Sequence, residues 1–263
     1  MDVRAVLAAF DEQVRQNPVP DPTVSIERDA HIVRVVSVSD GWNGVIWNHL
    51  DGSTADAVIA AEVERFAESG DWEWKYYSYD EPTDLPRRLL AAGLTPDEEE
   101  SFMVAELGAL DLGVVVPEGV RLVPVEDAAD VDAFIRASTD AFEESHPGLE
   151  AQVLASLSAQ PRTLRAVVAL AGDVPVAAGR VELPPSGEFA SLWGGGTVPA
   201  WRHRGVFRAL VAYRAQLARE RGFRYLQVDA APTSRPILER LGFVELAKTV
   251  PYRGRVKEPS AGS

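Results

Sequence analysis

The stretch TVPAWRHRGVFRAL, residues 197–210, decides the fold of the second half of the chain. Pro199 ends a strand, and a short polar loop then leads into a helix that begins at Gly205. A helix N-terminus offers unpaired N–H groups and about half a positive charge, and a glycine there lets a ligand approach the backbone closely. The stretch also carries three arginines: Arg202, Arg204 and Arg208. It therefore predicts a strand, an anion-binding loop and a helix, with phosphate as the natural occupant.

Two well-known phosphate loops do not fit this stretch. The pattern GxxxxGK[ST] of a Walker loop and the pattern GxGxxG of a dinucleotide fingerprint are both missing from it. Three glycines, residues 194–196, come just before the loop but lack the required spacing. They predict instead a bulge or a splay in the strand that contains them.

The patterns around this stretch predict alternating strands and helices. In the second half we expect strands at 121–125, at two places in 165–183, at 189–198, 223–230 and 244–252, and helices at 126–142, 148–158, 205–222 and 234–243. In the first half we expect an amphipathic helix within 1–18, strands at 31–38, 44–47, 72–79 and 100–107, and helices at 53–69, with Ser53 as N-cap, and at 82–94. Such a mixture predicts an α/β protein with mixed sheets.

The two halves end alike, in a strand, a helix with a Leu-Gly pair and a further strand. RRLLAAGL in the first half corresponds to ILERLGF in the second. This similarity predicts a degenerate structural duplication, and we expect domains at 1–112 and 119–257 with a disordered tail at 258–263.

Charge and cysteine content narrow the function classes. The first 110 residues hold 22 acidic and 8 basic residues, which is the whole net charge of −14, whereas residues 200–257 hold 13 basic and 4 acidic ones. The acidic bulk argues against nucleic-acid binding, and the local basic cluster favours a small polyanion. No apolar run approaches the roughly 18 residues of a membrane span. The absence of cysteine and of a signal-peptide pattern favours a cytoplasmic protein. The sequence leaves a monomer and a homodimer equally open.

Residues 119–255 resemble the GNAT superfamily of N-acetyltransferases in strand order and in two motifs. The pyrophosphate loop [QR]-x-x-G-x-[GA] corresponds to Arg202-His203-Arg204-Gly205-Val206-Phe207, and the strand and helix that end in Gly-Phe correspond to YLQVDAAPTSRPILERLGF. The resemblance implies a GNAT-like fold, in tandem with a degenerate first unit, and acetyl-CoA as co-substrate without a metal. It implies that amides near Arg204 to Arg208 hold the pyrophosphate. It further implies that Thr197 and Val198 pair with the pantetheine arm, and that Ser234 is either a CoA contact or a helix N-cap.

The chain departs from the pattern of this family at four positions. Phe207 replaces a small residue, and His203 stands where a glycine is common. The asparagine that often follows the fifth strand is missing, and Leu238 replaces the tyrosine that often protonates the leaving thiolate. The resemblance therefore supports cofactor binding better than it supports one particular catalytic mechanism.

Acyl transfer to an amine needs a group that takes the amine proton. Glu182, at the end of a strand, is a candidate base or an exposed carboxylate. Asp229 is a candidate partner of the amine or a helix cap, and Tyr252 is a candidate acid or a core residue. Trp193 and Trp201 are candidate walls of the acceptor pocket or core residues.

The sequence therefore predicts an N-acetyltransferase that acts on a primary amine of a small molecule or peptide. The acidic first half, including Asp80, Glu81 and Asp84, suggests a cationic acceptor. The alternatives are a non-catalytic acyl-CoA-binding or sensing protein, and a protein–protein module with a basic helix.

Overall fold

The computed structural model describes residues 1–19, 23–38, 41–67, 71–146 and 148–254. The predicted tail at 258–263 lies outside the described residues.

Contacts divide the chain into two compact units. The C-terminal unit comprises Met103–Val228 and Thr233–Val244, and the N-terminal unit comprises Asp2–Phe102, Asp229–Pro232 and the chain from Glu245 onward. The sequence predicts a division into consecutive domains instead. The difference arises because the chain passes from one unit to the other within three of its strands, at residues 102–103, 228–229 and 244–245.

The N-terminal unit contains a mixed sheet with the strand order β1-β2-β3-β4-β12, and β5 pairs with β12. Its elements are α1 (Val3–Phe10), the π-helical turn η1 (Asp11–Arg15), β1 (Val24–Arg28), β2 (Ile32–Ser37), β3 (Gly44–Asn48), α2 (Ala55–Arg65), β4 (Trp72–Tyr77), α3 (Leu85–Ala91), β5 (Thr95–Pro96) and β12 (Val244–Gly254). Apolar side chains of the strands and of α2 and α3 form one core, with Trp74, Ile59 and Leu89 fully buried. The strand β1 and the short β5 are additions to the predicted elements, and Thr54 rather than Ser53 precedes α2.

The C-terminal unit contains the strands β7-β8-β9-β10-β11 in this order, antiparallel except for the parallel pair β10–β11. Its elements are β7 (Val120–Pro124), α4 (Ala128–Phe142), α5 (Leu149–Ser158), β8 (Leu164–Ala171), β9 (Val174–Glu182), β10 (Phe189–Thr197), η3 (Pro199–Trp201), α6 (Val206–Glu220), β11 (Tyr225–Ala230) and α7 (Arg235–Arg240). The strand β6 (Glu100–Glu106), which η2 (Leu107–Ala109) follows, leads into this unit. The predicted order of strands and helices in the second half is confirmed.

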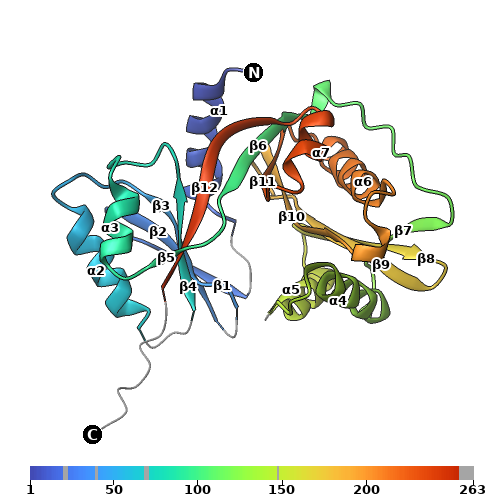
Figure 1. The fold of residues 1–263 in the computed structure, drawn as a ribbon, viewed down its shortest axis with the longest axis horizontal. Coiled ribbons are helices and arrows are strands. Elements are labelled where there is room, and N and C mark those ends of the chain that lie inside the picture. Colours follow the sequence, from blue (N-terminus) through green and yellow to red (C-terminus); the bar gives the residue numbers. More distant parts are fainter. Residues whose placement is uncertain (20–22, 39–40, 68–70, 147, 255–263) are drawn as a thin grey trace, which may run out of the picture. The chain divides into compact units, whose positions relative to one another are not determined.

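Helices cover both faces of this second sheet. In Figure 1, α4 and α5 lie on one side of β8–β10 and α6 lies on the other. The alternation of side chains along the strands explains this arrangement. Val168 and Ala178 point into a core with α4 and α5, whereas Val167 and Ala177 point into a core with α6. We call these two sides the α4 face and the α6 face.

Candidate functional site

The strands β10 and β11 pair over only part of their length. The parallel register joins Phe189–Ser191 to Tyr225–Gln227 and goes no further, although β10 continues to Thr197. On its other edge, β10 shifts register against β9 between Trp193 and Gly196. The glycine run therefore forms a β-bulge at the point where β10 leaves β11, which confirms the bulge or splay predicted from the sequence.

The bulge needs glycine because the two faces of β10 are crowded there. A Cβ on Gly195 would lie 2.9 Å from Nη2 of Arg214 and 3.2 Å from Cε2 of Phe207, both on α6. A Cβ on Gly196 would lie 2.8 Å from the Cβ of Ala141 at the end of α4. Real Cβ atoms essentially never come within 3.0 Å of another heavy atom in this way. The ring of Phe207, an unusual residue for the loop motif, thus packs where Gly195 carries no side chain.

The loop after β10 leads into a helix N-terminus that no side chain caps. Gly205, at the N-cap of α6, has φ 85°, which a residue with a Cβ adopts only at a cost. His203 also has a positive φ, 62°, which explains why glycine is common at this place in the motif. The first hydrogen bond of the helix runs from the N–H of Ala209 to the carbonyl of Gly205, 3.0 Å. The amides of Val206, Phe207 and Arg208 come before this bond and have no partner within the helix.

The arginines of the loop differ in what they contact. Arg202 donates through Nε to the carbonyl of Thr197 and through Nη2 to the carbonyl of Ala141, at 3.1 and 3.0 Å. It therefore fastens the loop to β10 and to the end of α4, which corrects its expected role as an anion ligand. Arg204 stacks over the ring of Trp201, with Cζ 4.7 Å from the ring centroid. The exposed side chains of Arg204 and Arg208 remain beside the helix N-terminus.

The expected pairing of the pantetheine arm at Thr197 and Val198 needs a correction. The N–H of Val198 donates to Val176 on β9, 2.9 Å, and its carbonyl accepts from Trp201, 2.8 Å. The edge of β10 that lacks a partner on β11 comes earlier, between Leu192 and Gly196. The side chain of Val206 is buried in the α6 core, so only its amide is left to meet a ligand. Ser234 stands at the N-cap position of α7, in line with one of its two predicted roles.

A buried arginine holds the bulge from the α6 face. Arg214 on α6 is 1% exposed and donates through Nη1 to the carbonyls of Arg180 and Trp193, at 3.0 and 3.3 Å. Burial, and then the neighbouring Arg180, lowers the pKa of Arg214 to about 9. Neither Arg180 nor Arg214 was predicted from the sequence as a residue of the site. The available signal was the spacing of Leu210 and Arg214, four residues apart, which places a charge on the apolar face of the helix.

Polar side chains gather on the α4 face of the same strands. Glu182 lies opposite Ser191, and Arg180 lies opposite Trp193, in the pairing of β9 with β10. Ser191 also lies opposite Gln227 of β11. Side chains of directly opposite residues share one face, so these five residues surround the point where the two strands separate.

Two of the three predicted catalytic residues lie in the N-terminal unit. Asp229 forms an ion pair with Lys75, 3.1 Å between Oδ2 and Nζ, and its side chain is 5% exposed. Tyr252 is buried in the core of that unit, edge-on to Tyr76 with the ring centroids 6.2 Å apart. Of the alternatives given for these residues, Tyr252 takes that of a core residue, and Asp229, the candidate partner of the amine, is already paired with the cation of Lys75.

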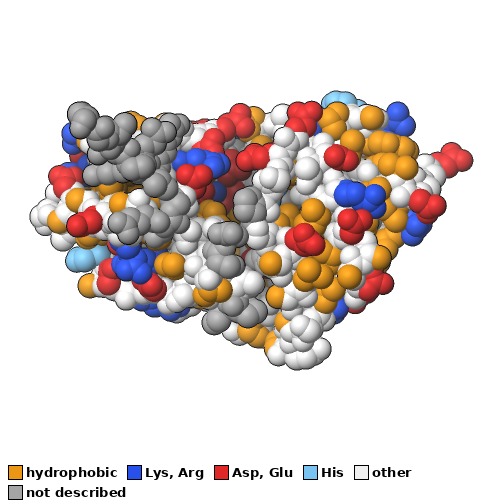
Figure 2. Space-filling model, turned by 90° about the horizontal axis from the view of Figure 1, so that it is seen from below, with side chains coloured by type: hydrophobic (Ala, Val, Ile, Leu, Met, Phe, Trp, Pro, Cys, Tyr) orange, Lys and Arg blue, Asp and Glu red, His pale blue; other side chains and the backbone are white. Residues whose placement is uncertain are grey.

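The acidic residues that suggested a cationic acceptor are partly neutralised. Asp80 is buried and accepts two hydrogen bonds from Arg15, both 2.8 Å. Asp84 accepts from Arg88 and Arg87, at 2.8 and 2.5 Å. On the face shown in Figure 2, acidic side chains lie among basic and apolar ones. The charge asymmetry of the sequence is therefore a weak guide to the acceptor.

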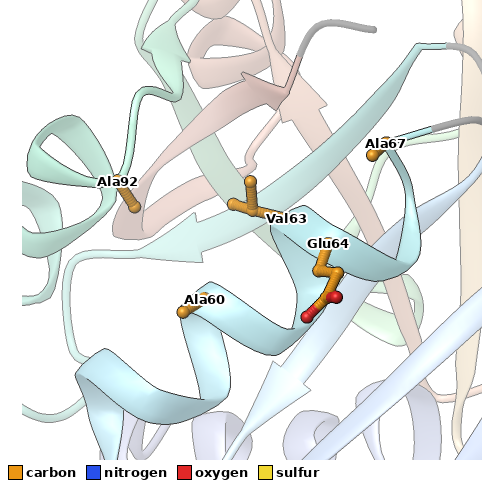
Figure 3. A pocket seen from close by; sticks show the side chains of 5 residues that line it. All are labelled: Ala60, Val63, Glu64, Ala67 and Ala92. Carbon is orange, nitrogen blue, oxygen red and sulfur yellow. The ribbon is translucent and has the colours of Figure 1, made fainter. Parts of the chain in front are cut away.

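Two surface hollows are lined by residues other than those of the bulge. One, of about 360 Å³, lies beside α2 in the N-terminal unit and is lined by Ala60, Val63, Glu64, Ala67 and Ala92. Figure 3 shows that small apolar side chains and one carboxylate make up this lining. The other, of about 260 Å³, lies between α4 and α5 and is lined by Ile135, Ser138, Thr139, Ser145, His146, Gly148, Leu149 and Glu150. The first hollow offers no group for acyl transfer, whereas the second borders the α4 face.

The described residues contain no group of three or more histidine and acidic side chains that could hold a metal ion. None of the helices among them is long and apolar enough to cross a membrane.

Residues 131–243 match the model of the acetyltransferase (GNAT) family. No curated protein is similar to this chain at a significant level.

Several solved structures have the same fold over nearly the whole chain. A GCN5-related N-acetyltransferase from Kribbella flavida is 18% identical with a TM-score of 0.70, and the match covers 96% of this chain and 93% of that one. One from Sphaerobacter thermophilus is 16% identical with a TM-score of 0.63, covering 97% and 92%. A tandem GNAT protein from the clavulanic acid biosynthesis pathway is 12% identical with a TM-score of 0.62, covering 92% and 86%. At these identities the likeness establishes the fold, including its tandem form.

Proposed function

On the premise that residues 131–243 of this chain are a GNAT acetyltransferase domain, we propose that the protein transfers the acetyl group of acetyl-CoA to the nitrogen of a primary amine. The observation that carries this proposal is the continuity of two features. The strand β10 separates from β11 after Ser191, and the same strand leads directly into the uncapped N-terminus of α6 at Gly205. A long, thin substrate with a diphosphate needs both features.

The residues present suit such a substrate. Amides of Val206, Phe207 and Arg208 would donate to the diphosphate, with the exposed guanidiniums of Arg204 and Arg208 beside them. The unpaired edge of β10 before Thr197 would pair with the amide groups of the pantetheine arm, as an added strand does. This path leads the thioester to the bulge at Gly194–Gly196.

The chemistry then needs one base and one set of donors. The amine nitrogen attacks the carbonyl carbon of the thioester, a C–N bond forms, the C–S bond breaks, and CoA leaves as a thiolate. Glu182, on the α4 face, would take the proton that the amine loses, directly or through water. Backbone amides of the bulge would donate to the oxygen that becomes negative.

One observation supports the rival function, a non-catalytic acyl-CoA-binding protein. The position at which the family often carries a tyrosine acid holds Leu238, which is 1% exposed. We expect turnover nonetheless, because a thiolate is a good leaving group and can take its proton from water.

Calorimetry with acetyl-CoA, followed by a thiol-release assay on a panel of primary amines, tests the proposal. We expect acetyl-CoA to bind, and Glu182→Gln to bind it equally while turnover falls by about 10²–10⁴-fold. Binding without release of thiol on any amine would favour the rival. A failure of acetyl-CoA to bind at all would refute both functions.

A further inference from the structure

Three buried polar atoms on the α4 face have no hydrogen-bond partner within the described part of the chain. They are Nε of Arg180, Nε1 of Trp193 and Oε1 of Gln227. Buried polar groups are nearly always hydrogen-bonded, because each one left unpaired destabilises the native state. Three of them on neighbouring strands therefore indicate a ligand that supplies the missing partners.

The pairing of the strands places these groups together. Arg180 on β9 lies directly opposite Trp193 on β10, and Gln227 on β11 is opposite Ser191, two residues before Trp193. The side of the sheet follows from β8, where Ala166 is opposite Arg180 and packs into the core with α4 and α5. The guanidinium of Arg180 lies over Gly194, where a Cβ would come within 2.9 Å of its Nη1.

The charge of this group is positive. Among the described residues we find no ion pair to Arg180, and burial lowers the pKa of its guanidinium, while Glu182 opposes this shift from a distance. The guanidinium of Arg214 approaches from the α6 face and donates its hydrogen bonds to main-chain carbonyls. A guanidinium with a buried and unpaired Nε is costly, and a negatively charged ligand would offset that cost.

The chemistry of the unpaired atoms specifies the ligand. Nε of Arg180 and Nε1 of Trp193 are donors and accept nothing, so they fit a carboxylate. Oε1 of Gln227 is an acceptor and fits an amine N–H. We propose that the acceptor carries a carboxylate near its amine, as an amino acid or a peptide with a nearby carboxylate does, and that Arg180 and Trp193 bind this carboxylate. The proposal rests on the proposed acetyl transfer and names the class of its acceptor.

The same geometry would also allow Arg180 to polarise the thioester, because the proposed path of acetyl-CoA places the thioester at the bulge. A guanidinium that polarised the thioester oxygen would help every amine equally. A guanidinium that bound the acceptor would help only acceptors with a carboxylate. The two roles are separated by comparing acceptors that differ in the carboxylate alone.

The test uses amino acids, each paired with the amine that remains after its decarboxylation, for example phenylalanine with 2-phenylethylamine and serine with ethanolamine. We expect kcat/KM for the amino acid to exceed that for its partner in the wild-type protein. In Arg180→Met, kcat/KM for amino acids should fall about ten- to a hundredfold, mostly through KM, as for a lost hydrogen bond to a charged group. The partner amines should change by no more than about twofold.

Two further variants and a binding measurement control this test. Arg165→Met removes a guanidinium from the neighbouring strand β8, where Arg165 lies opposite Val181 on the other face, and should leave the preference unchanged. Arg180→Lys keeps the charge and should keep part of the preference if Arg180→Met does not fold. The affinity for acetyl-CoA, measured by calorimetry, should be equal in all variants.

The outcomes separate this proposal from the proposed function. Turnover without preference for the carboxylate, or an equal loss for both members of each pair in Arg180→Met, would overturn the acceptor proposal and leave acetyl transfer standing. If no amine reacts, titration of the amino acids into the CoA-loaded protein decides, and absence of binding overturns the proposal. Failure of acetyl-CoA to bind would overturn the proposed function itself.

Discussion

The guanidinium of Arg214 on α6 holds the main-chain carbonyl of Arg180 on β9, with Nη1 3.0 Å from the oxygen. The same nitrogen reaches the carbonyl of Trp193 on β10, 3.3 Å away. One side chain thus joins two strands at the point where their register shifts. It supplies donors to carbonyls in the irregular part of the ladder, and it brings a positive charge into an apolar core to do so.

The charge of Arg214 should appear in the pH dependence of stability. Its pKa is lowered to about 9 in the folded protein, so above pH 9 the unfolded state binds more protons, and stability rises with pH until the arginine of the unfolded chain also loses its proton. Below pH 9 the buried charge destabilises the protein fully. Urea unfolding between about pH 8 and 10.5 should show a slope for the wild type that exceeds that of Arg214→Met by at most about 1.4 kcal/mol per pH unit. Parallel curves for the two proteins, with the exposed Arg208→Met as control, would contradict this pKa.

Gly195→Ala should destabilise the C-terminal unit. The new methyl group would meet Arg214 and Phe207 at 2.9 and 3.2 Å, and such overpacking costs about 1–3 kcal/mol. Phe207→Leu in the same chain should recover part of the loss, which a double-mutant cycle of urea unfolding measures. Gly108→Ala, where nothing lies within 4 Å, is the matched control and should change stability by less than about 0.5 kcal/mol. Additive losses in the double mutant would mean that Phe207 does not confine position 195.

Alanine variants of the two glycines that flank α6 distinguish an effect on ligand binding from an effect on stability. Gly205 precedes the helix with φ 85°, and Gly222 follows it with φ 83°. Alanine at either position should cost about 1–2 kcal/mol, because a Cβ disfavours this conformation while neither site is crowded. Gly205→Ala alone should also weaken acetyl-CoA binding in calorimetry, since it distorts the amides at the N-terminus. Equal affinities in the two variants would count against a diphosphate at Gly205.

His203→Gly should stabilise the protein. His203 holds a φ of 62°, a conformation that costs a residue with a Cβ about 1 kcal/mol or more. The exposed side chain makes no hydrogen bond or ion pair within the described residues that would offset this cost. Thermal unfolding should show a higher Tm, and Glu143→Gly, at the other non-glycine residue with positive φ, should behave alike. A lower Tm for His203→Gly would show that the loop gains from the imidazole.

Asp80→Asn should lower stability without changing the choice of acceptor. Breaking the buried pair with Arg15 leaves that guanidinium with Asp11 as its remaining carboxylate partner, so the cost should stay below the roughly 3–5 kcal/mol that an uncompensated buried charge costs. Asp84→Asn, an exposed position that pairs with Arg87 and Arg88, should cost less than about 1 kcal/mol. KM for cationic amines should stay constant in Asp84→Asn, and in Asp80→Asn at a temperature where it is folded. A rise in KM for cationic amines alone would restore the hypothesis of a cationic acceptor.

Much of the fold could be predicted from local patterns. The strand, loop and helix of residues 197–210, and the bulge from three glycines, follow from backbone preferences that neighbouring residues set. The first half was harder to predict. Burial does not alternate strictly along β1, and β5 has only two residues, so neither strand gives the alternating pattern that predicts a strand.

The site was predicted in part. The loop and the helix N-terminus could be predicted because they are contiguous in sequence, whereas the role of Glu182 as the base stays a prediction. Arg180 and Arg214 were missed because their contacts depend on what lies opposite them in the sheet. The surroundings of Asp229 and Tyr252 could not be predicted because their neighbours, Lys75 and Tyr76, are far away in sequence.

The sequence by itself determined where backbone groups stay unpaired, because glycine, proline and helix ends act over a few residues. The tertiary structure decided which charges are neutralised and which face each side chain occupies. Electrostatic energy and burial depend on distance in space, and pairing of strands brings together residues such as Arg180 and Trp193 that the chain itself keeps apart.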